Sequence, residues 1–290
     1  MKNLPIILTI ITLTIPSFFL NSFAAEKTNL VDAQIQQRER LSASIPEPAY
    51  SKDDIEAEIV FGRELASKIT GRYKQVKNNK LNLYVNKVGQ LVARNSVRSE
   101  LSYRFLVIKS KEINAFATPG GYIFITTGAL NQVKDESELA AILAHEIAHV
   151  EKRHYVKKVG IRSNKASPEQ GFVAILTGGG ASAVKAFQTA IDETLEILFT
   201  KGLQSHKDEF EADEISIWLL ANTGYDPTAL SRYFKRISNL PMTMHNTTTT
   251  INKTHPSLIT RYTKLDELLQ LYQLNNLQQA TLEERFNANK

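Results

Sequence analysis

The segment from Leu139 to Val150 constrains the fold more than any other, because it is an apolar helix containing His145, Glu146 and His149. Apolar side chains surround it almost completely, so we expect it in the protein interior. Two imidazoles and a carboxylate are costly there unless something satisfies them. The histidines are four residues apart and share one helix face, so both can bind one metal ion. The glutamate can then take a proton from a water molecule that the metal polarises. The segment therefore predicts a buried metal-binding helix, with hydrogen-bonded core histidines and a buried acid as the alternative.

The amino-acid composition limits the kinds of site that this chain can build. It has 290 residues and no cysteine. This excludes disulfides, thiolate zinc ligands, a cysteine nucleophile and the modified cysteine of a lipoprotein. A zinc site must therefore use histidine and carboxylate ligands. The net charge of +5 is modest, and the basic residues are spread along the chain. We expect no nucleic-acid partner, while a weak peripheral contact with an anionic membrane surface stays open.

The first 24 residues have the features of a secretory signal peptide. The apolar stretch from Leu4 to Leu20 follows Lys2, and a small-residue cleavage site ends at Ala24. We expect cleavage after Ala24 and export to the periplasm, with an uncleaved membrane anchor as the alternative. The remaining chain is expected to have three parts: a flexible leader at 25–50, a catalytic domain at 51–274 and a polar C-terminal tail at 275–290.

The hydrophobic pattern predicts a small sheet just before the metal-binding helix. Strands are expected at 101–108, 113–116 and 122–126, with a turn at 119–121. Helical spacing of apolar residues predicts helices at 53–70, 82–93, 191–220, 229–237 and 258–274, and a polar loop at 240–254. The small-residue segment 171–190 is compatible with a lid, a membrane-facing loop or a packed helix. The fold class is therefore predicted to be α+β, mainly helical.

Two further features concern the metal-binding helix itself. Asp135 and Glu138 resemble a capping box at its start, with Ser137 as a competing N-cap. Residues 151–154 are expected to continue the same element as a charged tail. His154 lacks the spacing and glycine of the histidine-rich sites that use a third histidine, so we expect it near the metal ligands or in a structural role at the helix end.

The third metal ligand is expected on a second helix, in the acidic run at 208–214. Glu209 and Asp213 are four residues apart and share a face, whereas Glu211 points elsewhere. Glu209 is then a candidate ligand, and Asp213 a candidate acceptor for the ring N–H of a ligand histidine. Because the run contains several acids, spacing alone leaves Glu211 open as the alternative ligand.

These residues belong to a set of motifs that together resemble one protein family. The chain resembles the HtpX/BepA-type zinc metallopeptidases of peptidase family M48, which also includes the CAAX prenyl endopeptidases. The matching segments, in chain order, are Asn114–Gly121, Leu143–Val150 with Arg153 and His154, Glu209–Asp213, Gly224–Pro227, and Thr254–Pro256 with Arg261. The resemblance is to the periplasmic BepA-like branch, without a helical-repeat domain after Leu269.

The resemblance implies a gluzincin-type metallopeptidase domain with a small sheet or hairpin before the HExxH helix. It implies one zinc ion bound by His145, His149 and Glu209, with Asp213 beside the ligands. It further implies that Asn114, Ala115, Phe116 and Ala117 form an edge strand to which an extended substrate adds. In such enzymes a histidine in a His-Pro loop keeps the site latent, and His255 matches it. Arg261 matches a residue near that loop, where it could stabilise oxyanion charge.

These features together predict a zinc-dependent metalloendopeptidase with Glu146 as the general base. The expected substrates are unfolded or misassembled cell-envelope proteins, in a quality-control role. The alternative is a chaperone-like or scaffold protein of the same fold that binds unfolded chains and uses zinc mainly for structure. A metal-free domain with satisfied core histidines is a third possibility.

Overall fold

The computed structural model describes residues 50–161, 180–203, 205–240, 255–277 and 279–290. The predicted signal peptide at 1–24 and the leader at 25–50, apart from Tyr50, therefore lie outside the described residues. So do residues 171–179 of the small-residue segment and nearly all of the predicted loop at 240–254. All of the described residues belong to one compact unit, which spans residues 47–290.

The sheet has three strands in the order β1-β3-β2, with β1 at Arg104–Ile108, β2 at Ala115–Thr118 and β3 at Tyr122–Thr126. Strand β3 runs parallel to β1 and antiparallel to β2. The β2–β3 hairpin closes through a 3-10 turn, η1, at Pro119–Gly121. Gly120 and Gly121 in this turn have φ of 75° and 90°, values that favour glycine. The α+β class is confirmed, and the predicted strand at 122–126 has the observed bounds.

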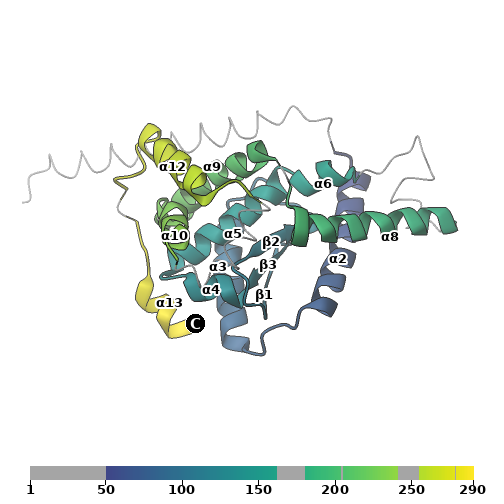
Figure 1. Cartoon of the computed structure of the whole chain (residues 1–290), viewed down its shortest axis with the longest axis horizontal. Helices are drawn as coiled ribbons and strands as arrows, with labels where there is room; N and C mark the ends of the chain where they lie inside the picture. Colours follow the sequence, from purple (N-terminus) through teal and green to yellow (C-terminus); the bar gives the residue numbers. More distant parts are fainter. Residues whose placement is uncertain (1–49, 162–179, 204, 241–254, 278) are drawn as a thin grey trace, which may run out of the picture. The chain divides into compact units, whose positions relative to one another are not determined.

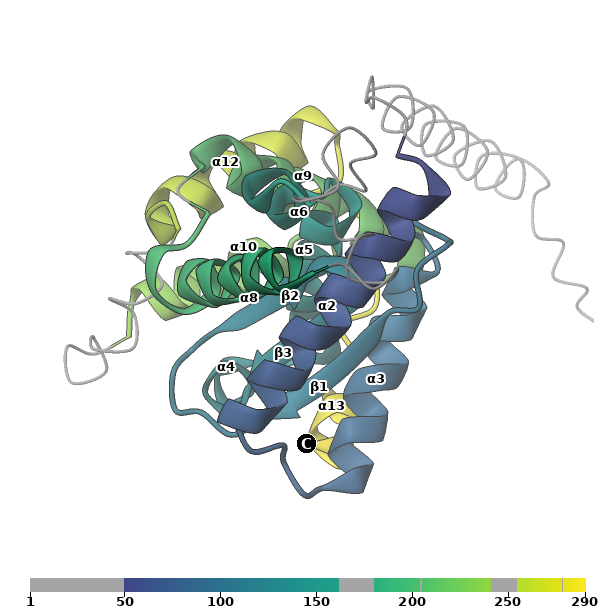
Figure 2. The same ribbon diagram turned by 90° about the vertical axis from the view of Figure 1, so that its right-hand side faces the viewer.

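Two long helices precede the helix with the HExxH motif and cover the sheet. Helix α2 spans Lys52–Arg72 and α3 spans Asn79–Ala93. In Figure 1 the sheet lies between α2 and the central helix α5, and Figure 2 shows α2 crossing in front of the strands. Gly62 allows this close packing, because a Cβ there would lie 1.6 Å from the backbone oxygen of Pro119. Helix α2 therefore rests directly on the turn of the hairpin.

Helix α5, Glu136–Glu151, carries the HExxH motif and is buried along its whole length. The Asp135 side chain caps it by accepting a hydrogen bond of 2.9 Å from the Glu138 amide. The predicted capping box is only half formed, because the Glu138 carboxylate accepts from the Lys134 amide instead. The short helix α4, Thr127–Gln132, precedes it. Burial of the entire helix confirms that α5 forms the centre of the domain.

The predicted charged continuation of the HExxH helix is wrong. Helix α5 ends at Glu151, and a separate helix, α6, begins at His154 and runs to Val159. Arg153 between them has φ of 54°, in the left-handed region that ends a right-handed helix. The break turns His154 back toward the histidines of α5.

The predicted single helix at 191–220 is also wrong, because the structure divides it. Helix α8 spans Ala181–Glu196, a π-helical turn η2 spans Ile197–Lys201, and α9 spans His206–Thr223. Gly202 has φ of 68° and ψ of 176°, a combination that is essentially restricted to glycine. Ser205 then caps α9 by accepting from the Asp208 amide. The break lets α9 pack beside α5 with its acidic run facing the motif.

The described residues of the C-terminal part contain helices α10 at Ala229–Ser238, α12 at Leu258–Leu271 and α13 at Glu283–Asn289. The segment predicted as a polar tail contains α13, whose Phe286 is 1% exposed and lies against Tyr84. Glu136 accepts hydrogen bonds from Arg285 of α13 and from Tyr84. Burial disfavours the charge of Glu136, but these hydrogen bonds, led by Arg285, hold its pKa below 4.5. Helix α13 is therefore held against the domain by the Phe286 ring, by the ion pair between Arg285 and Glu136, and by a hydrogen bond from Lys80 to the Ala288 carbonyl oxygen.

Among the residues that the structure describes, no helix is both long and apolar enough to cross a membrane.

Candidate metal centre

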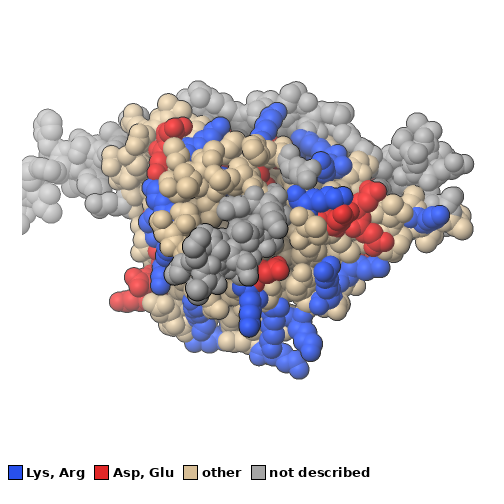
Figure 3. All heavy atoms as spheres, in the orientation of Figure 1, with Lys and Arg blue, Asp and Glu red and all other residues tan. Residues whose placement is uncertain are grey.

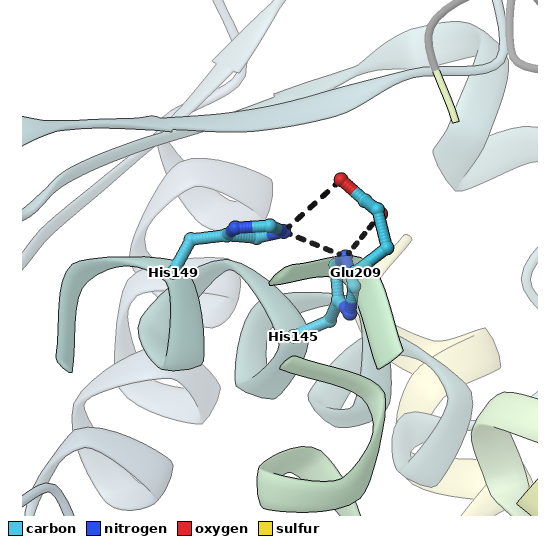
Figure 4. A group of neighbouring side chains, drawn as sticks. All are labelled: His145, His149 and Glu209. Atoms are coloured by element: carbon cyan, nitrogen blue, oxygen red, sulfur yellow. Dashed lines mark hydrogen bonds and ion pairs between the residues drawn. The ribbon is translucent and has the colours of Figure 1, made fainter. Parts of the chain in front are cut away.

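Three side chains from two helices converge at the centre of the domain (Figure 4). His145 and His149 extend from one face of α5, and Glu209 extends toward them from α9. The two Nε2 atoms are 3.0 Å apart. Glu209 Oε2 lies 3.5 Å from His145 Nε2, and Glu209 Oε1 lies 3.6 Å from His149 Nε2. Ligands about 2.0–2.1 Å from a tetrahedral zinc ion are roughly 3.4 Å apart, so this triangle fits such an ion.

The outer nitrogens of the two imidazoles explain why their inner nitrogens are free to bind a metal. His145 Nδ1 lies 3.0 Å from Asp213 Oδ1, and an ionised carboxylate can only accept, so this nitrogen carries the proton. His149 Nδ1 lies 2.8 Å from His154 Nδ1. Arg261 Nη2 lies 3.1 Å from His145 Nε2 and can donate to it, which agrees with an unprotonated Nε2. If both outer nitrogens donate, the Nε2 lone pairs of His145 and His149 face one another. A cation between them removes this conflict, which supports a metal at the centre.

Burial and charge around the three groups agree with this interpretation. Burial lowers the pKa of His149 well below 6.5 and so keeps its imidazole neutral. Burial also disfavours the charge of Glu209, but the facing His255 and His149 hold its pKa well below the usual range. Against burial and Arg261, the Asp213 and Glu209 carboxylates raise the pKa of His145 to about 9. A metal bound here would displace that proton.

Glu209 also has unsatisfied acceptors. Within the described residues, neither of its carboxylate oxygens has a hydrogen-bond partner, although both are buried. A buried carboxylate oxygen without a donor is costly, and a metal ion would satisfy it. The acidic run therefore places Glu209 at the centre, while Glu211, the alternative that spacing left open, is turned toward His154.

The predicted base, Glu146, is buried and lines a cavity together with His145 and His255. Burial raises the pKa of Glu146 above 4.5, and the nearby His145 only partly offsets this. A carboxylate that is less acidic than usual, next to a metal position, is suited to accept and return a proton.

The Asp213 carboxylate is itself fixed by a second buried group. Arg261 from α12 donates to both of its oxygens, from Nε at 2.9 Å and from Nη2 at 2.6 Å. The guanidinium carbon of Arg261 also lies 4.3 Å from the centre of the Phe234 ring. The resemblance implied that Arg261 stabilises oxyanion charge. In the structure Arg261 also forms an ion pair with Asp213, and this pair holds the Asp213 carboxylate against His145.

His154 connects His149 to Glu211, which the sequence had left open as an alternative ligand and not as a partner of His154. Its Nδ1 faces His149, and its Nε2 lies 3.2 Å from Glu211 Oε2. Glu211 in turn pairs with Lys152 at 3.0 Å. Hydrogen bonds from His154 and, to a lesser degree, from Lys152 hold the pKa of Glu211 at about 2. Glu211 is visible in the acidic run of the sequence, but it meets His154 only because the chain breaks at Arg153 between α5 and α6.

His255 is the first residue of the described segment 255–277, shortly before α12, and it lies beside the candidate ligands. Its Nδ1 is 2.7 Å from Glu209 Oε2, although the two atoms are not aligned as a hydrogen bond. The predicted substrate strand is also adjacent. Asn114 and Ala115 line the same cavity as Glu146, while Phe116 and Ala117 are buried in β2. Strand β2 forms one edge of the described sheet.

With this geometry established, the chain can be compared with known proteins. The model of the family described as "Peptidase family M48" matches residues 79–269 of this chain. The chain belongs to peptidase family M48. The matched residues include all three converging side chains, and the family that the motifs suggested is therefore confirmed.

Similar proteins carry two kinds of name. A "Beta-barrel assembly-enhancing protease" of Yersinia pestis is 28% identical over 234 residues, which cover 75% of this chain and 44% of that protein. The protein of that name from Escherichia coli K12 is 27% identical over 205 residues, covering 65% and 39%. A "Mitochondrial metalloendopeptidase OMA1" of Schizosaccharomyces pombe is 32% identical over 190 residues, covering 64% and 52%. This chain spans about two fifths of the length of the bacterial relatives.

Proposed function

We propose that this M48 protein is a zinc-dependent endopeptidase. The observation that carries the proposal is the convergence of His145, His149 and Glu209, with Glu146 beside them on the same helix. Two imidazoles and one carboxylate are a donor set of catalytic zinc sites, which leave a further position for water or substrate. The relatives' names, protease and metalloendopeptidase, agree with this chemistry.

Each residue then has a defined task in peptide hydrolysis. Bound zinc would supply a Lewis acid that polarises the peptide carbonyl and makes water more acidic. Glu146 takes a proton from the attacking water and passes it to the leaving amine. Asp213 and His154 hold the two imidazoles in the tautomers that leave Nε2 free. Arg261, fixed by Asp213 at the cavity wall, is placed to stabilise negative charge on the carbonyl oxygen.

The proposed substrate is an extended peptide segment that adds to β2, which forms one edge of the described sheet. Such addition uses backbone hydrogen bonds, so it requires an unfolded stretch of chain rather than a folded surface. Ala115 to Ala117 belong to this edge strand, and Asn114 immediately precedes it. Asn114 and Ala115 line the same cavity as Glu146. Together with the signal peptide predicted at 1–24, this leads us to propose a role on unfolded or misassembled envelope proteins in the periplasm.

A weak membrane contact is a further part of this proposal. The loop between α2 and α3 carries exposed Lys74 and Lys77, and Lys80 follows at the start of α3. Figure 3 shows Lys and Arg side chains along the lower edge of this face, where Figure 1 places the loop. A surface of this charge would be attracted to anionic lipid headgroups, with a strength that falls as salt rises.

The identity of the third ligand is tested by comparing two acids on α9. Glu209→Gln removes a ligand, so zinc content of the purified protein and cleavage of denatured casein should both fall to background. Glu214→Gln is the matched control, because Glu214 lies on the same helix and is hydrogen-bonded by Tyr272 instead. Full zinc content and cleavage in Glu209→Gln would overturn the proposed ligand set.

His255 supports a latent form of the enzyme, and its removal separates a latent peptidase from a chaperone-like protein. If His255 restrains the site through its contact with Glu209, His255→Ala should cleave casein faster than the wild-type chain at equal zinc content. A binding protein with structural zinc would show no cleavage in either form. Unchanged or slower cleavage in His255→Ala would contradict the latency proposal while leaving the peptidase assignment.

A further inference from the structure

The cavity beside the proposed base has one polar wall and one apolar wall. The polar side contains His145, Glu146, His255 and Arg261. The apolar side is built from the segment before β2, from α4, from α5 and from α10, which lies beside α5 in Figure 1. Its residues are Ile113, Ala129, Ile142, Leu230, Tyr233 and Phe234.

Resting on the proposed peptidase function, we infer that this apolar wall is a substrate-selecting subsite. It would bind one uncharged, aliphatic or aromatic side chain next to the cleaved bond. The cavity volume is about 60 Å³. One water molecule needs about 10–15 Å³ of such space, so there is room for several waters or for one apolar side chain.

The position of the cavity connects it to the chemistry. Ile142 lies three residues before His145 on α5 and therefore on the same face of that helix. Asn114 and Ala115 at the β2 edge form the neighbouring wall. A peptide that extends along β2 presents successive side chains to opposite faces. Only one of the two residues that flank the cleaved bond can therefore enter the cavity, so selection should act at a single position.

The chemistry of the walls favours an apolar occupant. Tyr233 contributes its ring, because its hydroxyl donates a hydrogen bond of 3.4 Å to the Ala129 carbonyl oxygen. The one arginine in the wall, Arg261, is already bound by both oxygens of Asp213. An acidic substrate side chain would compete for Arg261 with Asp213 and with the carbonyl oxygen that Arg261 is proposed to stabilise. A basic side chain would pair with Glu146 and block the proposed base. Either charged group would lose water on entering the cavity and would interfere with a residue of the proposed mechanism.

The size of the expected preference follows from hydrophobic pockets in general. One methylene group in such a pocket changes kcat/KM by about 10- to 200-fold. Leucine at the selected position should therefore be cleaved at least about tenfold faster than alanine. Aspartate, glutamate, lysine and arginine should be nearly absent from that position.

The test maps cleavage sites in a denatured protein mixture by mass spectrometry, using the zinc-loaded full chain and its His255→Ala form. Two variants change the cavity in opposite directions. Ala129→Leu fills it and should shift the preference toward alanine and glycine. Leu230→Ala enlarges it and should shift the preference toward phenylalanine and tryptophan. Leu65→Ala is the control, because Leu65 is a fully buried leucine of α2 that does not line the cavity.

The outcomes separate this inference from the proposed function. Enrichment of large apolar residues at one position, moved by both cavity variants but not by Leu65→Ala, supports the inference. Cleavage with no such enrichment overturns the subsite and leaves the peptidase proposal standing. An enrichment that neither cavity variant moves overturns its assignment to this cavity. Absence of cleavage by wild type and His255→Ala overturns the peptidase proposal, and the subsite with it.

Discussion

Replacement of His154 by phenylalanine is expected to weaken zinc binding although His154 is not a proposed ligand. Phenylalanine retains the ring but offers no nitrogen to His149 Nδ1, which lies 2.8 Å from His154 Nδ1. His149 and His154 are 2% and 3% exposed, so water has little access to replace the lost partner. The His149 imidazole would then be free to rotate or to change tautomer, and its Nε2 would be less well directed.

The expected loss of zinc affinity follows from the single hydrogen bond between His149 and His154. A buried N–H left without an acceptor costs about 1–3 kcal/mol. Each 1.4 kcal/mol is about a factor of ten, so the zinc dissociation constant should rise roughly 5- to 150-fold. Glu211→Leu should have a smaller effect, under about tenfold, because Glu211 contacts His154 and its loss leaves the contact between His149 and His154 in place.

The assay is competition for zinc between the purified chain and a chromogenic chelator, with urea unfolding of the metal-free proteins run in parallel. Glu214→Gln on the same helix serves as the control. The order of dissociation constants should be His154→Phe, then Glu211→Leu, then control and wild type. A His154→Phe protein that binds zinc within twofold of wild type, whatever its stability, would refute the reasoning and leave His154 a packing residue.

Three other predictions concern stability. Gly62→Ala should destabilise the fold by more than about 3 kcal/mol in urea unfolding, because its Cβ would overlap Pro119, whereas Gly71→Ala, with open space around it, should change stability by less than about 1 kcal/mol. Arg285→Met should lower the free energy of unfolding by about 1 kcal/mol at pH 7, since the arginine is half-exposed. Because the pKa of Glu136 is depressed below 4.5 in the folded protein, this stability difference is present above pH 4.5 and should vanish as the pH falls through the folded-state pKa of Glu136. A stability difference that does not depend on pH would argue against the ion pair. A chelator should lower the unfolding free energy of zinc-loaded protein by about 3–4 kcal/mol when zinc had been 100- to 1,000-fold above its dissociation constant, and zinc should restore it, whereas an unchanged calorimetric transition would mean that no metal is bound.

The sequence is informative wherever structure depends on neighbours along the chain. The hydrophobic pattern of 122–126 and the apolar helix around His145 could be assigned directly, and the i, i+4 spacing of Glu209 and Asp213 correctly predicted one shared face. These features follow from the period of strands and helices and need no tertiary contact.

The features that could not be predicted depend on contacts between distant segments. Gly202 follows the π-helical turn in a conformation that is essentially restricted to glycine, but a glycine alone does not determine that α9 packs beside α5. Arg153 adopts a left-handed conformation that an arginine seldom takes without support from its surroundings, which here include Glu58 and Tyr50. The partnership of His154 with Glu211 follows from both breaks at once. These pairings require the packed structure, and the left-handed conformation of Arg153 is unfavourable when taken alone.

The proposed mechanism depends most directly on Glu146, so the decisive measurement is casein cleavage by Glu146→Gln and wild type at equal, measured zinc content. Glutamine keeps the side-chain shape but cannot accept the proton. The mechanism predicts one zinc ion per chain in both proteins and a cleavage rate about 10²- to 10⁴-fold lower in the variant. Cleavage by Glu146→Gln at the wild-type rate, with zinc bound, would contradict it.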